Sequence, residues 1–285
     1  MKTNKDFIKL FDLNVPNEEH FDYYINQLSK TSRFSNIYEL YNQFLLIEGI
    51  DDFYEFKKRK SFEIIEFIKN TNAFIELSYD KNLLDLPTNK NFTYEEGVNY
   101  LSVDIKSANW VSLKRYDQDN QLGDNYTELL SKFDMPEIFS NSKYLRQFIF
   151  GNVNPKKQQK IQRNIIQNVV RQFSGLLSVE CVKNDEVIFS FDSFDEIKDI
   201  ISKIDSNVYK TKLFQIERVE DFRIDSHFDQ DENLLTKEMV GVNAHQFYLK
   251  LKQYITKEKI DLQDLYFKQD GKLALWVIDN LKIEI

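Results

Sequence analysis

The pattern of apolar residues separates a helical first third of the chain from a mixed remainder. In the first third, apolar positions recur at helical spacing over 21–28 and over 37–44. The same spacing predicts two further helices over 51–59 and 61–70, joined at the basic run KKRK. Turn-forming residues cluster over 82–91 and the periodicity lapses there, so we expect a linker in that segment.

The remainder alternates between strand and helix patterns. The apolar run VNYLSV predicts a buried strand over 98–103 that ends at Asp104. Two alternating runs, 176–182 and 186–191, flank Lys183-Asn184-Asp185, which is the composition of a hairpin turn. Further along the chain we expect a helix over 194–204, a strand over 213–219, an acidic loop over 220–232, a helix over 243–256, and a final hairpin of 265–267 with 273–278.

The segment 143–175 is strongly basic. It holds seven basic residues and no carboxylate, although the whole chain has a formal net charge of -8. Gly151 and the pair Asn154-Pro155 break it into two helices, predicted over 142–150 and 155–173. Such a cluster is either a solvated helical face or a surface that meets phosphate groups.

Composition narrows the class of protein. With 285 residues and 42% hydrophobic residues, the chain can bury a sizeable core. No apolar run approaches the roughly 20 residues that span a bilayer, so we expect no membrane contact. The N-terminus lacks a signal-peptide pattern, and the single cysteine, Cys181, lies in an apolar run and is expected to be buried. We therefore expect a cytoplasmic or otherwise intracellular protein that is not secreted.

These patterns together predict an α+β protein. We expect a helical N-terminal region over 1–90, a domain built on an antiparallel sheet backed by helices over 91–228, and a small α+β extension over 229–285.

An ordered set of motifs runs through the middle of the chain. A strand ending at Asp104 is followed by a basic helix with Arg146 ahead of Phe150-Gly151, and then by a hairpin with Asp185-Glu186 at its turn. In this order the chain resembles the palm and fingers of template-dependent polymerases, most closely the DNA polymerase A family. The counterparts of that family's motifs A, B and C are VDIKSANWVSLKR (103–115), RQFIFG (146–151) and KNDEVIFSF (183–191).

The resemblance implies a minimal polymerase-like nucleotidyltransferase that adds nucleotides to a nucleic-acid 3′ end. Two-metal transfer requires carboxylates from adjacent strands, and Mg²⁺ or Mn²⁺ prefers such oxygen ligands. By the resemblance, Asp104, Asp185 and Glu186 would be the catalytic residues, with Asp104 and Asp185 as metal ligands and Glu186 as an auxiliary ligand or a residue that supports them. Nucleoside triphosphates and nucleic acid are the implied partners, and protein partners are not indicated. The implied binding residues are Lys143, Arg146, Phe150, Lys156, Lys157, Lys160 and Arg163, with Arg146 on the triphosphate and Phe150 stacked on the base.

The chain departs from the family pattern at several motif positions. Arg146 stands where the family has lysine, and Asn184 stands where it has histidine. Asn109 occupies the position that commonly holds a sugar-discriminating glutamate, so the choice between ribose and deoxyribose stays open. The resemblance extends over about residues 98–225.

The same residues also have ordinary structural interpretations. Asp104 is suited to capping a helix, Asn184-Asp185 to forming a turn, Arg146 to a solvated helical face, and Phe150 to a core. Two other functions therefore remain as alternatives: a non-catalytic nucleic-acid-binding module that uses the basic helices 142–173, and a structural or interaction protein.

Overall fold

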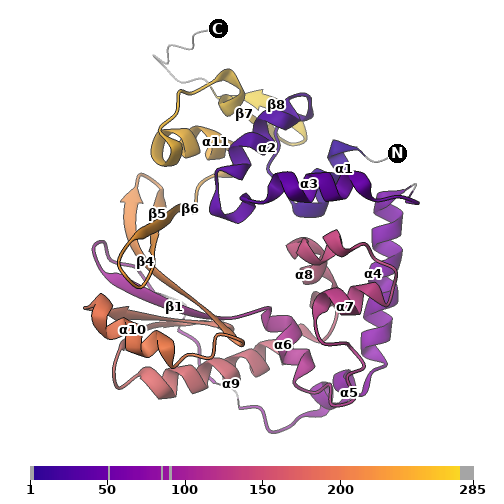
Figure 1. Ribbon diagram of the computed structural model, residues 1–285, viewed down its shortest axis with the longest axis vertical. Coiled ribbons are helices and arrows are strands. Elements are labelled where there is room, and N and C mark those ends of the chain that lie inside the picture. The colour runs from indigo at the N-terminus through magenta and orange to yellow at the C-terminus, as the bar shows by residue number, and fades with distance from the viewer. Residues whose placement is uncertain (1–2, 51, 85, 90–91, 277–285) are drawn as a thin grey trace. The chain divides into compact units, whose positions relative to one another are not determined.

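The predicted α+β class is confirmed by a computed structural model of the chain, which combines many helices with a six-stranded antiparallel sheet (Figure 1). The structure describes residues 3–50, 52–84, 86–89 and 92–276. Within these residues, no helix has both the length and the apolar composition needed to cross a membrane.

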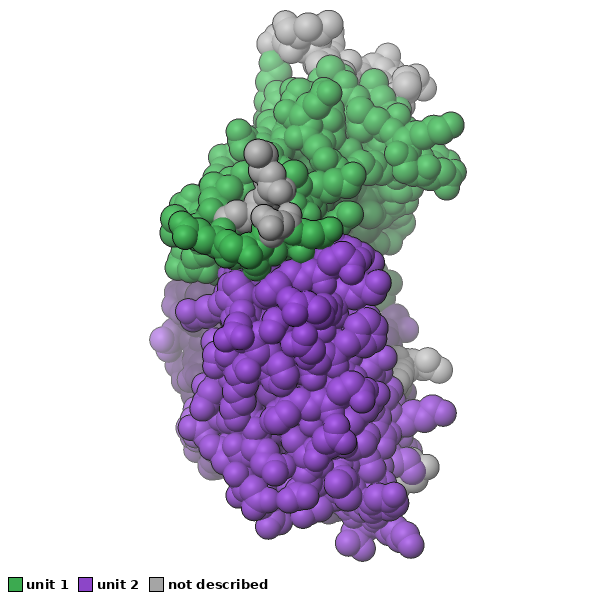
Figure 2. All heavy atoms as spheres, turned by 90° about the vertical axis from the view of Figure 1, so that its right-hand side faces the viewer, with its two compact units in different colours: residues 1–53, 217–226, 236–285 green, residues 54–216, 227–235 purple. Residues whose placement is uncertain are grey.

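The chain forms two compact units, coloured separately in Figure 2. Unit 1 comprises residues 1–53, 217–226 and 236–285, and unit 2 comprises residues 54–216 and 227–235. This division differs from the three predicted regions 1–90, 91–228 and 229–285. The described part of the expected linker over 82–91 lies within unit 2, and Arg163 and Asn164 of a long helix donate hydrogen bonds to the carbonyls of Leu86 and Leu84.

The helices and strands follow in this order. The first half contains α1 (Asn4–Phe11), α2 (Phe21–Ser29), α3 (Ile37–Leu46), α4 (Phe53–Lys69), α5 (Asn72–Tyr79), β1 (Asn99–Ile105), α6 (Ala108–Lys114) and α7 (Tyr126–Ser131). The second half contains α8 (Lys143–Gly151), α9 (Pro155–Phe173), β2 (Ser178–Val182), β3 (Glu186–Phe191), α10 (Phe194–Ser202), β4 (Tyr209–Val219), β5 (Phe222–Phe228), β6 (Leu234–Val240), α11 (Phe247–Lys250), β7 (Tyr266–Gln269) and β8 (Lys272–Leu275).

Strand β1 lies in the interior of the sheet. The strand order is β2-β3-β1-β4-β5-β6, and β1 pairs antiparallel with both β3 and β4. Asp104 is opposite Glu186 on β3 and opposite Lys210 on β4. The end of β1 therefore carries an acidic residue between an acidic and a basic neighbour.

The two faces of the sheet differ in character, because side chains alternate along a strand. Leu101 and Val103 lie on a face that is buried against α9, which runs along the sheet in Figure 1. The opposite face carries Tyr100, Ser102 and Asp104. Its apolar end is a cluster of Tyr100, Cys181, Ile188, Phe214 and Ile216, with Phe92, Tyr94 and Val98 packed against it. The polar end of this face begins at Ser102.

The basic segment folds as the predicted pair of helices. Helix α8 begins after Ser142, whose hydroxyl accepts a hydrogen bond from the Leu145 amide at 3.2 Å. Helix α9 begins at Pro155. Proline lacks a backbone N–H, but at the first position of a helix that N–H would have no partner within the helix. Between them Asn154 adopts a left-handed conformation with φ 50°, so the break predicted at Gly151 and Asn154-Pro155 is confirmed.

Other predicted elements need correction. The segment 53–69 is one helix, α4, and the basic run 57–60 lies inside it. Strand β4 begins at Tyr209, four residues earlier than predicted. The expected acidic loop over 220–232 instead contains β5, in which Phe222, Ile224 and Asp225 are buried. The acidic residues of this segment concealed the apolar alternation of the strand in the sequence. Asp225 can be buried because the Arg223 guanidinium, 2.7 Å away, neutralises its charge.

The C-terminal predictions hold in outline. The segment predicted as a helix over 243–256 forms a 3-10 turn, the short α11, and a π-helical turn over Leu251–Thr256. The final hairpin, β7 with β8, turns at Asp270-Gly271, both with positive φ. Part of its predicted second strand, 277–278, lies outside the described residues.

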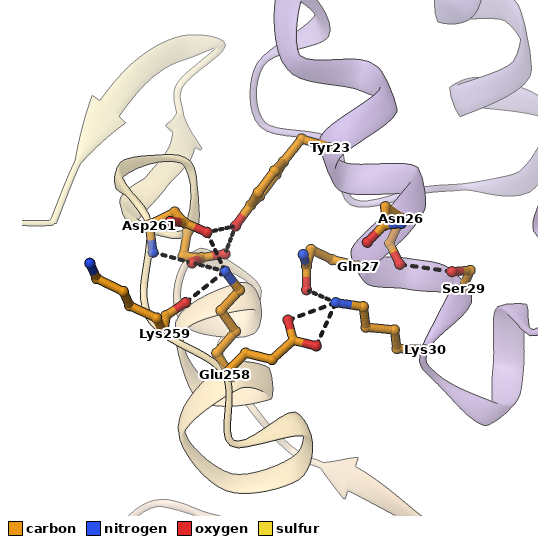
Figure 3. Close-up of polar contacts among 10 residues, drawn as sticks. Tyr23, Asn26, Gln27, Ser29, Lys30, Glu258, Lys259 and Asp261 are labelled. Atoms are coloured by element: carbon orange, nitrogen blue, oxygen red, sulfur yellow. Dashed lines mark hydrogen bonds and ion pairs between the residues drawn. The ribbon is translucent and has the colours of Figure 1, made fainter. Parts of the chain in front are cut away.

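Unit 1 contains a partly buried polar cluster that joins α2 to the C-terminal segment (Figure 3). We call Tyr23, Lys252, Asp261 and Asp264 the Asp264 cluster. The Tyr23 hydroxyl donates to Asp264 at 2.7 Å, and Lys252 Nζ lies 2.5 Å from Asp261 and 3.1 Å from Asp264. Every charge in this cluster therefore has an opposite charge or a hydrogen-bond donor beside it.

Candidate functional site

The ends of β1 and β3 bring together the two aspartates singled out in the sequence. The Ile105 amide donates a 2.9 Å hydrogen bond to the Asp185 carbonyl, so the hairpin turn lies directly beside the end of β1. Asp104 and Asp185 both line a cavity of about 220 Å³ in unit 2. Asp104 near the end of β1 and Asp185 in the turn before β3 thus line the same space.

Helix α8 and strand β4 supply positive charge to the same cavity. Lys143, Arg146 and Gln147 line it from α8, and Lys210 lines it from β4. Lys143 is exposed, and Arg146 is half-buried. The cavity therefore combines two carboxylates with three cations in a chain whose net charge is -8, which is a lining suited to an anionic ligand held together with a cation.

The electrostatics of Asp104 reflect its crowded position. Burial raises the pKa of the Asp104 carboxyl, Lys210 opposes this rise, and the nearby negative charges of Asp185 and Glu186 add to it. Lys210 Nζ lies 2.7 Å from Asp104 Oδ2. The Lys210 ammonium thus stabilises the ionised form of the Asp104 carboxyl.

Glu186 is held differently from the two aspartates. The Ser102 hydroxyl donates to Oε1 at 2.6 Å, and Lys183 Nζ lies 2.5 Å from Oε2. Both of its carboxylate oxygens therefore already have partners. This arrangement suits a residue that shapes the charge around Asp104 more than one that binds a ligand directly.

A second hollow of about 230 Å³ adjoins the first, and Asn109, Gln147 and Asp185 line both. Its lining is dominated by side-chain amides. These are Asn109, Gln147, Gln158, Gln159, Gln162 and Asn184. Gln162 Nε2 donates to Asn109 Oδ1 at 2.9 Å, which fixes two of them relative to each other. A hollow lined by two carboxylates and three cations thus continues into one lined mainly by amides, in which Asp185 is the charged residue.

The basic residues of α9 that the sequence predicts to bind nucleotide or nucleic acid lie outside both hollows. The side of α9 that lines the second hollow carries Pro155, Gln158, Gln159 and Gln162, at helical spacing. The predicted binding residues on this helix are Lys156, Lys157, Lys160 and Arg163, and neither cavity lining includes any of them.

Two of these α9 residues have structural partners instead. The Lys157 ammonium donates to the Asp80 carbonyl, and the Arg163 guanidinium donates to the Leu86 carbonyl at 3.2 Å. They fasten the segment after α5 to α9. Lys156 is exposed at the start of the helix.

The prediction that Phe150 stacks on a base is corrected by its burial. The Phe150 side chain is 0% exposed, with its ring 5.8 Å from Tyr126 and 6.4 Å from Trp110. Phe150 is among the residues that line the second hollow, but its apolar ring packs in the core between α6, α7 and α8, so a base cannot stack on it in this conformation. The core interpretation of Phe150 is therefore the one the structure supports.

The structure also addresses the other ordinary interpretations. Asp104 lies within β1, and the N-cap of α6 is Ser107, so Asp104 is not a helix cap. Asn184-Asp185 does form the turn between β2 and β3, while both residues also line a hollow. Turn formation and a place in the cavity are compatible here.

Sequence reasoning missed Lys210 and the glutamines of α9. The spacing of Gln158, Gln159 and Gln162 was visible in the sequence and places them on one side of a helix. Without a structure, nothing indicated that this side lines a cavity. Lys210 could be placed opposite Asp104 only once the start of β4 and its register were known.

The carboxylates fit a divalent cation that is completed by other ligands. Mg²⁺ takes oxygen ligands and usually keeps several waters, binding through one or two carboxylates plus substrate phosphates. Asp104 and Asp185 are of this kind and face one cavity. Across the part of the chain that the structure describes, no three or more His, Cys, Asp or Glu side chains converge as a metal site. The protein alone thus offers two carboxylates and not a complete cage.

No protein-family model matches this chain, and no curated protein matches it in sequence.

Proposed function

We propose that the cavity of unit 2 is a nucleotidyl-transfer site, in which a nucleic-acid 3′ hydroxyl attacks the α-phosphate of a nucleoside triphosphate. The observation that carries this proposal is the shared cavity. Asp104, Asp185, Lys143 and Arg146 come from three separate segments of the sequence, and all four line one hollow.

Each group has a role that its chemistry allows. Arg146 and Lys143 hold the triphosphate, because charge-assisted hydrogen bonds from cations to phosphate oxygens are strong and directional. Asp104 and Asp185 hold divalent cations. When bound, these cations activate the attacking hydroxyl and neutralise charge on the departing pyrophosphate.

The amide-lined hollow suits the uncharged part of the substrate. Asn109, Gln147 and Asn184 offer both hydrogen-bond donors and acceptors, which match sugar hydroxyls and the edges of bases. Lys143 and Arg146, the proposed phosphate-binding cations, line the first hollow and not this one. The hollow with the cations therefore suits the triphosphate of a nucleotide, and the amide-lined hollow suits its sugar and base.

A binding module that uses α9 as a basic surface receives less support. Lys157 and Arg163 are engaged with backbone carbonyls of unit 2, and the cavity-facing side of α9 carries amides. The positive charge that faces a cavity comes instead from α8 and β4.

The test is nucleotide incorporation by the purified full chain. A labelled primer, alone or annealed to a template, is incubated with Mg²⁺ or Mn²⁺ and with ribo- or deoxyribonucleotides. Asp104→Asn and Asp185→Asn should abolish extension. Asp192→Asn is the matched control, since Asp192 is exposed and lies just after the opposite end of β3.

Extension by the wild type and the control, but by neither cavity variant, would support the proposal. Strand binding without extension under every condition would point to the binding module. An absence of both activities would remove the basis for any role in nucleic-acid chemistry.

A further inference from the structure

Lys210 forms an ion pair with Asp104, one of the two carboxylates that the proposed function assigns to a divalent cation. It lies directly opposite Asp104 in the β1–β4 register, and its ammonium is 2.7 Å from Oδ2. Its side chain is 50% exposed, whereas that of Asp104 is 25% exposed. Lys210 is therefore held by its backbone position, while its long side chain has room to swing away.

The surrounding charges explain why a cation is needed there. Asp104 lies near Asp185 and Glu186, and both raise its pKa after the larger effect of burial. Three neighbouring carboxylates repel one another, and one nearby positive charge relieves that repulsion. Glu186 has an equivalent partner in Lys183, on its own hairpin.

We propose that Lys210 is a resident counter-cation of Asp104, which a divalent cation must displace in order to bind. This inference rests on the proposed function, because it assumes that Asp104 is a metal ligand. Binding then becomes an exchange in which the ion pair between Lys210 and Asp104 is broken as the metal contact forms. Lys210 thereby weakens metal affinity and stabilises the metal-free strand.

Lys212 provides a control matched in charge and position. It lies on β4 two residues beyond Lys210, so it points to the same face of the sheet. Its cross-strand partner is Ser102, an uncharged residue, and it is not part of the cavity lining. Removing Lys212 also deletes one positive charge from this face but leaves Asp104 paired.

The experiment is Mn²⁺ binding to the full chain, followed by electron paramagnetic resonance or calorimetry and without any substrate. We expect Lys210→Met to bind Mn²⁺ about two- to fivefold more tightly, the range that corresponds to losing a partly exposed ion pair as competitor. Lys210→Gln should show the same sign. Lys210→Arg and Lys212→Met should bind like the wild type.

A second readout separates exchange from a general change in stability. Without metal, Lys210→Met should have a lower melting temperature than the wild type, and saturating Mn²⁺ should raise its melting temperature by more than that of the wild type. In an Asp104→Asn background, the effect of Lys210→Met on Mn²⁺ affinity should disappear, because the two residues act as a pair.

The outcomes distinguish this inference from the proposed function. If Asp185→Asn loses Mn²⁺ binding but Lys210→Met binds no more tightly than the wild type, the metal site stands and the exchange role of Lys210 is wrong. If neither the wild type nor Lys210→Met binds Mn²⁺, even with a non-hydrolysable nucleoside triphosphate present to complete the coordination, both the metal site and the inference built on it are overturned.

Discussion

The cavity of unit 2 and the Asp264 cluster of unit 1 are built from similar side chains and are suited to different tasks. Each combines carboxylates with lysine. In the Asp264 cluster the side chains of Lys252 and Asp264 are 3% and 0% exposed. In the cavity, the side chains of Asp104 and Lys210 are 25% and 50% exposed.

The difference shows what separates a structural ion cluster from a candidate binding site. In the Asp264 cluster, the Tyr23 hydroxyl and the Lys252 ammonium occupy the carboxylates (Figure 3). Burial, followed by the hydrogen bond to Asp264, raises the pKa of Tyr23. In the cavity, the carboxylates and cations surround a space. Both the Asp264 cluster and the cavity contain groups with a perturbed pKa. It is the open cavity beside Asp104 and Asp185 that makes theirs the candidate binding site.

The largest expected effect concerns the cavity carboxylates. Asp185→Asn should lower the incorporation rate on the order of a thousandfold, because it removes charge that acts on the reacting groups. The free energy of unfolding should change by less than about 1 kcal/mol, since the side chain is only partly buried. Incorporation assays and urea unfolding on the same preparation measure both. A variant that is inactive because it is unfolded would leave the comparison without support.

The opposite behaviour is expected in the Asp264 cluster. Lys252→Met leaves Asp264 buried without its cation, and this should lower the free energy of unfolding by about 3–5 kcal/mol. Lys272→Met, at an exposed position of β8, should change it by less than about 0.5 kcal/mol. Urea denaturation followed by circular dichroism gives both values. A Lys252→Met variant as stable as the wild type would show that the cluster is not a structural ion pair.

Arg146 gives a smaller effect that tests which positive charges meet the triphosphate. Arg146→Ala should raise KM for the nucleoside triphosphate about 10- to 100-fold, the worth of a charge-assisted hydrogen bond. Lys156→Ala should leave KM within about twofold, because Lys156 lies outside both cavity linings. Equal effects of the two substitutions would favour the basic helix α9 over the cavity.

The smallest effect is a pH dependence within unit 1. A hydrogen bond from Lys252 lowers the pKa of Asp261, and burial only partly opposes it. Because the folded pKa is depressed, the stabilisation is present above the unfolded pKa, about 4, and is lost as the pH falls through the folded value.

The measurement compares urea unfolding of the wild type and Asp261→Asn between pH 6 and pH 3. At pH 6 the variant should be less stable by under about 1 kcal/mol, since the Asp261 side chain is 48% exposed. The difference should shrink below about pH 4. A gap that stays constant down to pH 3 would mean that the charge of Asp261 contributes nothing.

The sequence predicted the local elements of the site better than their surroundings. Strand β1, the hairpin of β2 and β3, and helices α8 and α9 follow from apolar periodicity and from turn residues, which act over a few positions. The choice of Asp104, Asp185, Lys143 and Arg146 came from the resemblance and from charge, and the four residues do line one cavity.

What the sequence could not predict depends on long-range packing. Whether Phe150 faces the core or a ligand depends on which rings from α6 and α7 meet it. Likewise, helical periodicity shows that the glutamines of α9 share a side, but only the fold shows that this side lines a hollow. The pairing of Lys210 with Asp104 requires the register of two strands about a hundred residues apart.

The most direct test of the central claim is a crystal structure of the protein with Mn²⁺ and a non-hydrolysable nucleoside triphosphate. We predict an anomalous Mn²⁺ signal at about 2.1 Å from carboxylate oxygens of both Asp104 and Asp185, with the triphosphate against Arg146 and Lys143. Lys210 should have moved off Asp104. Mn²⁺ and triphosphate bound elsewhere, with the ion pair between Lys210 and Asp104 intact, would contradict the assignment of this cavity as the nucleotidyl-transfer site.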